Sequence, residues 1–135
     1  MTAEQARANA DLALKKARAA LTAAQALLAL SLWDDAVSRA YYAAFHAAQA
    51  LLVSRGLEAR SHAGLGALLW EHFVRPGVVS KSLGRDLSSL QKFREDADYD
   101  LNQRFDDESA RAEVDKASRV VAEIEAHLHQ PDATA

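Results

Sequence analysis

In this 135-residue chain, the segment from Arg94 to Tyr99 combines residue types that could do chemistry. Arg94 precedes Asp98 by four residues, and Glu95 precedes Tyr99 by four, so in a helix each pair shares a face. A guanidinium held by a carboxylate keeps its charge and presents planar donors that suit a phosphate group. The alternative is a local ion pair on a helix surface, which contributes little stability. The segment therefore predicts a phosphate-binding arginine with supporting acidic residues.

A second candidate group lies on an earlier helical stretch. At about 100° per residue, Arg39, Tyr42 and His46 fall on one face of that helix. Tyr41 and Phe45 fall on a neighbouring, more apolar face, which we expect to pack in the core. Alanines between them leave room for another helix to approach closely. A histidine, with an ordinary pKa near ~6.5, suits proton transfer, and the alternative for His46 is a buried ring bonded to a carbonyl or a tyrosine.

Helices must position these residues, because alanine and leucine dominate and only five glycines and two prolines interrupt the chain. Thr2 and Ser31 each begin a pattern typical of a helix N-terminus, and Gly56 is typical of a helix end. We expect helices over residues 1–30, 32–56, 62–74, 80–101 and 106–129. With short connections these predict an all-α fold, an antiparallel four- to five-helix up-and-down bundle, in a single domain over residues 1–135.

The composition also argues against several classes of protein. The absence of cysteine excludes disulfides and thiolate sites, and is typical of a cytoplasmic protein. We expect no membrane association, because the chain has neither a basic segment followed by an apolar core at its N-terminus nor a run of about 18 apolar residues. We expect no metal and no cofactor, since the sequence contains no H-E-x-x-H motif, glycine-rich phosphate loop or dinucleotide fingerprint.

Charge is divided unevenly along the chain. Residues 1–93 carry 11 Lys and Arg against 7 Asp and Glu, whereas residues 94–135 carry 5 against 12. This asymmetry could align chain halves or subunits through complementary fields, or the charges could simply belong to solvated helix faces. In either case the chain is not a strongly basic nucleic-acid binder.

Three ordered motifs resemble the HEPN superfamily, in particular its small stand-alone prokaryotic branch, which is UPF0332-like. The matching stretches are Ser38–His46, Gly56 with Ser61–Gly64, and Arg94–Tyr99. The resemblance extends over roughly residues 33–101 and implies a HEPN-like helical bundle. We expect His62, in the second motif, to fix its loop beside Ser61 rather than to act in catalysis.

The resemblance also implies an activity. Many HEPN proteins are metal-independent ribonucleases with a site formed across a homodimer, where an arginine is followed four to six residues later by a histidine. Here Arg94 matches the arginine, Tyr99 stands at the five-residue offset, and no histidine lies between residues 73 and 126. An unperturbed tyrosine is a poor base at neutral pH, so His46 is the candidate for the titrating group. The candidate catalytic residues are therefore Arg94, Tyr99 and His46, supported by Arg39, Tyr42, Glu95 and Asp98.

Stand-alone HEPN proteins often pair with a minimal nucleotidyltransferase as toxin and antitoxin, and in some pairs a tyrosine near the arginine motif receives nucleotide. Tyr99 is the matching position. The resemblance thus implies a toxin-type component that acts as a metal-independent ribonuclease on RNA. The alternatives are a non-catalytic subunit that binds a nucleotidyltransferase partner or a nucleotide, and a purely structural helical dimer.

A homodimer also has support from composition. The larger aromatic side chains exceed what a thin bundle needs to bury, unless all of them pack inside one subunit; they are Trp33, Tyr41, Tyr42, Trp70 and Phe93.

Overall fold

The computed structural model describes residues 2–99, 101 and 105–130, and these residues form helices and turns with no strand. The α-helices are α1 (Ala3–Ala29), α2 (Trp33–Val53), α3 (His62–Leu69), α4 (Lys81–Tyr99) and α5 (Asp107–Leu128), and α3 continues into a π-helical turn, η1 (Trp70–Val74). The all-α fold predicted from the sequence is confirmed. No helix in these described ranges is both long and apolar enough to cross a membrane.

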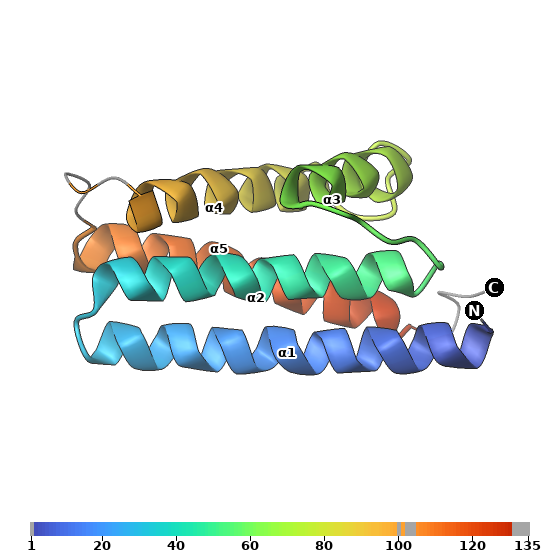
Figure 1. Cartoon of the computed structure of the whole chain (residues 1–135), viewed down its shortest axis with the longest axis horizontal. Helices are drawn as coiled ribbons and strands as arrows, with labels where there is room; N and C mark the ends of the chain where they lie inside the picture. The colour runs from blue at the N-terminus through green and yellow to red at the C-terminus, as the bar shows by residue number, and fades with distance from the viewer. Residues whose placement is uncertain (1, 100, 102–104, 131–135) are drawn as a thin grey trace.

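Four long helices form an antiparallel up-and-down bundle (Figure 1). Among the described helices, α2 and α5 contact each other and both remaining long helices, whereas α1 and α4 lie on opposite sides of that pair without touching. The short α3 covers one half of α4 and also contacts α2 (Figure 1). This arrangement makes α2 the central helix on which the candidate site is built.

Alanines line the contact between α1 and α2. The capping box expected at Thr2 is present, and the buried positions of α1 recur every three or four residues, mostly as alanine. The facing side of α2 is also alanine-rich and fully buried. Small side chains let two helices approach closely, so the larger residues of α2 are left to face α3 and α4.

The start of α2 differs from the sequence expectation. Ser31 does not cap the helix: its φ of 59° places it in the left-handed region, and α2 begins after Leu32 without a side-chain cap. Asp34, in the first turn, instead accepts a hydrogen bond from the Phe105 N–H at 3.1 Å. That bond ties the start of α2 to the segment that precedes α5. Local sequence does not specify this partner, which is 71 residues away.

A left-handed glycine and a capping serine shape the connection from α2 to α3. Gly56, with φ of 72°, ends the α2 region, and the Leu57 N–H bonds the Leu52 carbonyl at 3.0 Å, as is typical after a left-handed glycine. The Ser61 hydroxyl accepts from the Gly64 N–H at 2.9 Å and caps α3. Two caps therefore fix the position of His62, the first residue of α3.

The expected helix over residues 62–74 changes type part-way. From Trp70 the chain forms a π-helical turn, closed by a bond from the Arg75 N–H to the Trp70 carbonyl at 2.8 Å. This wider turn brings Phe73 and Val74 into the core while the Trp70 side chain stays exposed. The helix expected over residues 80–101 corresponds to α4, which is helical through Tyr99. Residue 100 lies outside the described residues.

Candidate functional site at the contact of α2 and α4

Arg94 lies in α4 with its side chain only 11% exposed, although it carries a permanent charge. One terminal nitrogen donates to Oδ2 of Asp98 at 3.3 Å, and the other lies 4.0 Å from a carboxylate oxygen of Glu95. The Tyr99 ring centroid is 6.0 Å from the guanidinium carbon. In the described residues the buried Nε has no hydrogen-bond partner. The predicted arginine and acidic residues are thus gathered in one place, with the arginine incompletely satisfied.

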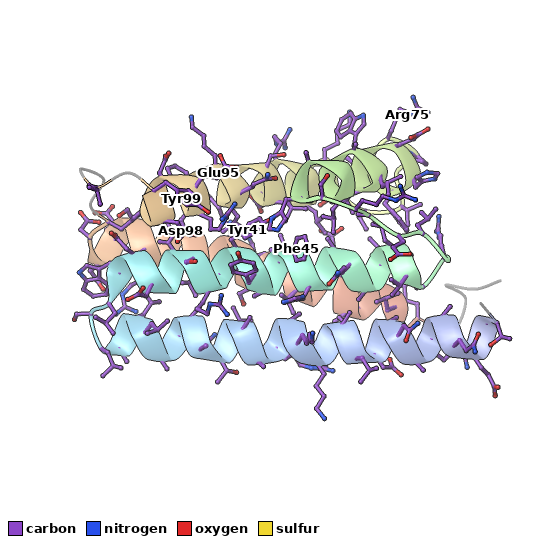
Figure 2. The ribbon with its side chains drawn as sticks, viewed as in Figure 1. Tyr41, Phe45, Arg75, Glu95, Asp98 and Tyr99 are labelled. Carbon is purple, nitrogen blue, oxygen red and sulfur yellow. The ribbon has the colours of Figure 1, made fainter. Side chains whose placement is uncertain are left out.

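Tyr41 of α2 forms the wall behind this arginine. Its ring centroid lies 5.2 Å from the Arg94 guanidinium carbon, a cation–π contact, and its side chain is about as buried as any in the core. Figure 2 shows Tyr41 and Phe45 on α2 beside Glu95, Asp98 and Tyr99 on α4, while Arg75 lies at the far end of the molecule. The guanidinium therefore sits at the junction of the two helices.

A polar bond fixes the Tyr41 ring. Its hydroxyl and Nδ1 of His62 are 2.5 Å apart. Burial, partly offset by the positive charge of Arg94, raises the pKa of Tyr41 to about 12, so the hydroxyl keeps its proton at neutral pH and can donate it. The His62 ring also stacks on Phe45, with centroids 4.6 Å apart. His62 thus joins α3 to α2 and orients the ring against which Arg94 rests.

Sequence reasoning missed this role of Tyr41. Its apolar helix face correctly predicted burial, but burial alone does not reveal that the hydroxyl has a partner. His62 was expected to fix its loop beside Ser61; in the structure its ring bonds Tyr41 of α2, 21 residues earlier in the sequence. A buried tyrosine usually finds a partner for its hydroxyl, and that rule was the available signal.

A second group of predicted residues lies on the adjacent face of α2. The Arg39 guanidinium carbon is 4.7 Å from the Tyr42 ring centroid, and the Tyr42 and His46 ring centroids are 6.4 Å apart. Nδ1 of His46 is 3.1 Å from Oε1 of Gln49. Because an amide oxygen only accepts, Nδ1 carries the proton and Nε2 keeps a free lone pair.

The electrostatic surroundings keep His46 neutral. Burial, opposed by the Gln49 bond but reinforced by the positive charges of Lys16 and Arg39, lowers the pKa of His46 below its ordinary value. A neutral imidazole with a free Nε2 can accept a proton from a substrate hydroxyl. Geometry and charge together thus suit the base role expected of His46.

Tyr42 connects the two groups. It packs edge-on against Tyr41, with centroids 5.2 Å apart, and it lies close enough to Arg94 for an electrostatic interaction. Among the described residues His46 and Arg94 form no hydrogen bond or ring contact with each other: His46 lies beside the Tyr42 ring, and Arg94 rests on the Tyr41 ring. The structure thus brings the predicted residues into one continuous surface, with arginine and histidine separated within a subunit.

A buried ion pair near this surface was not foreseen. Between α4 and α5, Nζ of Lys116 lies 2.7 Å from the buried carboxylate of Glu113, donates to Ser89 at 3.0 Å, and rests 5.3 Å from the Phe93 ring centroid. Lys116 therefore packs against α4 at Phe93, one residue before Arg94.

Among the described residues, no group of three or more histidine, aspartate or glutamate side chains could hold a metal ion.

Comparison with known proteins agrees with the fold and the motifs. Residues 10–127 match the HEPN domain. The chain is 34% identical over 110 residues to "Putative toxin MJ0605" of Methanocaldococcus jannaschii, covering 77% of this chain and 82% of that protein. It is 33% identical over 111 residues to a UPF0332 protein of Thermotoga maritima, covering 82% and 84%.

A solved structure agrees as well. The crystal structure of TT1696 from Thermus thermophilus superposes with a TM-score of 0.76 at 25% sequence identity, covering 87% of this chain and 97% of that one. With a HEPN match over most of its length, UPF0332 relatives above 30% identity and a shared helical bundle, this chain belongs to the HEPN domain family.

Proposed function

We propose that this protein is a toxin-type HEPN ribonuclease that cleaves RNA without a metal ion, acts in the cytoplasm as a homodimer, and is paired with a minimal nucleotidyltransferase. The observation that carries the proposal is the buried, permanently charged Arg94, which is held against Tyr41 and has an unpartnered Nε. A buried cation with unused donors is costly in a purely structural role. Two relatives with toxin names, both from Methanocaldococcus jannaschii, support the toxin part.

The cleavage step needs a base and a cation. Nε2 of His46 takes the proton of the ribose 2′-hydroxyl, and the 2′-oxygen forms a bond to the adjacent phosphorus. The bond from phosphorus to the 5′-oxygen breaks, and that oxygen takes a proton from solvent water as it leaves, which yields a 2′,3′-cyclic phosphate and a 5′-hydroxyl; His46 returns its proton to solvent. Arg94 stabilises the negative charge on the phosphate oxygens during this step. In this scheme Arg94 and His46 come from different subunits of the dimer.

The contacts of Arg94 leave it ready to bind a phosphate. Its bond to Asp98 is 3.3 Å long, whereas a charge-assisted hydrogen bond is typically about 2.7–2.9 Å. Asp98 and Glu95 both stand at the solvent side of α4. A phosphate oxygen can therefore replace the weakly held carboxylate, with Tyr99 donating an additional hydrogen bond to it.

RNA cleavage in EDTA tests the proposal. Wild-type protein should cleave total RNA, and Arg94→Ala should lower the rate by about 10²-fold or more, which is the usual cost of losing one group that stabilises transition-state charge. Arg85→Ala is the matched control, because Arg85 is an exposed arginine on the opposite face of α4. Circular dichroism of Arg94→Ala shows whether the variant still folds. Arg94→Lys keeps a positive charge at this position and shows whether charge alone is enough for cleavage. Intact RNA with well-folded wild-type protein would overturn the ribonuclease assignment.

The exposure of Tyr99 favours a second candidate function, a non-catalytic subunit modified by its partner. Tyr99 is 76% exposed, whereas Tyr41 is buried and Tyr42 is half-buried, so Tyr99 presents the most accessible phenol of the three tyrosines. In such a modification the phenol oxygen attacks the α-phosphorus of ATP, releasing pyrophosphate and a proton.

Mass spectrometry distinguishes this candidate. After incubation with ATP and a nucleotidyltransferase encoded beside it, the wild-type chain should gain the mass of a nucleotide on Tyr99. Tyr99→Phe should stay unmodified, while Tyr42→Phe should be modified like wild type. Modification at another residue, or at none, would remove this function and leave the ribonuclease assignment standing.

A further inference from the structure

Two further cations, one on α1 and one on α2, lie near His46. Lys16 of α1 and Arg39 of α2 are both exposed, and neither forms an ion pair with any described residue. By contrast, Arg94, Arg111 and Lys116 each have a carboxylate partner. Two neighbouring cations without such a partner attract an anion from solution.

The bundle geometry places both cations on the side of α2 that carries His46. A tight turn between Ala29 and Trp33 makes α1 and α2 antiparallel, so Lys16 and His46, which are equally far from that turn, lie opposite each other. Arg39 lies two helical turns before His46, and its guanidinium is stacked on the Tyr42 ring between them. The electrostatic influence of both cations on His46 agrees with this placement.

The two arginines lie on either side of a pair of tyrosines. Arg39 rests on Tyr42 at 4.7 Å, Tyr42 packs edge-on against Tyr41 at 5.2 Å, and Arg94 rests on Tyr41 at 5.2 Å. Of these groups, Arg39 is exposed and Tyr42 is half-buried, and a cation beside an accessible aromatic ring is a feature with which proteins hold single-stranded nucleic acid. The spacing separates the cations by more than one ring, so one phosphate group does not satisfy both.

We infer that Lys16, Arg39 and the edge of Tyr42 form a second phosphate subsite, which holds a phosphate of the same RNA strand next to the one bound by Arg94. This inference rests on the proposed function and narrows its substrate to a single-stranded oligonucleotide, as opposed to a mononucleotide or a dinucleotide.

Salt-dependent binding tests the subsite. The probe is a fluorescently labelled 2′-O-methyl RNA single strand, which cannot be cleaved through its 2′-oxygen, and affinity is measured by anisotropy at several salt concentrations. For a single strand, each lost phosphate contact lowers the slope of log K against log salt by about 0.7. The double variant Lys16→Gln with Arg39→Gln removes one phosphate contact, so it should lower the slope by about 0.7 and weaken binding of the long strand, while binding of a dinucleotide stays the same.

A matched control carries the same change in net charge. Lys15→Gln with Arg85→Gln removes two exposed cations that have no ion pair in the described residues and lie on other faces of α1 and α4. This control should keep the wild-type slope, and Arg39→Lys should restore most of the slope lost with Arg39→Gln. If wild-type protein binds the strand through Arg94 but both double variants show the same salt slope, the second subsite is wrong. The proposed ribonuclease would be unaffected by that result. No binding by folded wild-type protein would overturn both.

Discussion

At the scale of single residues, the site depends on the way Tyr41 is held. The ring is fixed by His62 at its hydroxyl and carries Arg94 on its face. Sequence periodicity predicted the buried position of this residue but not its polar partner, because His62 reaches it only after the chain has turned from α2 into α3. The residue that sequence reasoning assigned to packing is thus also the one that positions the arginine.

Removing the Tyr41 hydroxyl should destabilise the protein. Tyr41→Phe leaves Nδ1 of His62 without its partner, and we expect the free energy of unfolding to fall by about 1–2 kcal/mol in urea denaturation. Tyr42→Phe is the control, since its hydroxyl makes no hydrogen bond to the described residues, and it should change little. In a double-mutant cycle with His62→Gln, a coupling energy of zero would contradict the bond.

Protonation of histidine should make stability depend on pH. The pKa of His46 is lowered in the folded protein, chiefly by burial, so the unfolded chain takes up this proton more readily. The contribution of His46 is therefore fully present above about pH 6.5, the ordinary histidine pKa, and is lost as pH falls towards the lowered folded value. Burial also lowers the pKa of His127, so protonation of His127 should lower stability as pH falls, as for His46.

Urea denaturation at a series of pH values checks this expectation. His46→Gln should lose stability less steeply than wild type between neutral and mildly acidic pH, and His127→Gln should show a similar but separate effect. Identical curves for His46→Gln and wild type would contradict the neutral, buried state assigned to His46.

At the scale of elements, the start of α4 is fixed by a residue of α5. The backbone N–H and the hydroxyl of Ser80 donate to the two carboxylate oxygens of Glu123 at 2.8 and 2.7 Å, while the hydroxyl accepts from the Leu83 N–H at 3.1 Å. The register of α4 against α5, and with it the position of Arg94 further along α4, depends in part on this bond.

Removing this cross-helix cap should lower stability. Glu123→Gln gives up the charge on both acceptor oxygens, and we expect a loss of about 1 kcal/mol in thermal or urea unfolding, the usual value of a helix cap. Asp115→Asn is the matched control on an exposed side of α5. In the double variant with Ser80→Ala, stability losses that simply add would show that the two side chains act independently. That result would rule out the bond between the Ser80 hydroxyl and Glu123.

The sequence predicted most of the elements because their signals are local. The capping box at Thr2 and the glycine end at Gly56 are both determined by a few adjacent residues. The π-helical turn after Leu69 and the Ser80–Glu123 bond were not predictable in that way, since each depends on what the helix packs against. For the same reason, motif spacing could assemble the Arg94 cluster but could not show its contact with Tyr41.

At the scale of the whole molecule, the proposed site is completed by a second copy of the chain. Tyr99 and Leu101 are highly exposed at the end of α4 that carries Arg94, so apolar surface is available there for a partner. Light scattering should give twice the 14.7 kDa chain mass at micromolar concentration. Leu101→Asp should weaken the dimer, whereas Leu12→Asp, at an exposed position on α1, should not. A monomer in the wild type would exclude a site shared between subunits.

The packing of α1 on α2 also sets an order of events during synthesis. These two helices share the most extensive contact of any described pair and are complete by Val53. Because a chain emerges from the ribosome N-terminus first, at about 5–20 residues per second, this hairpin can form before the codon for Arg94 is read. The guanidinium then docks onto a Tyr41 ring already in place, so a nascent chain lacks the contact on which our proposed activity depends until its last two helices have been made.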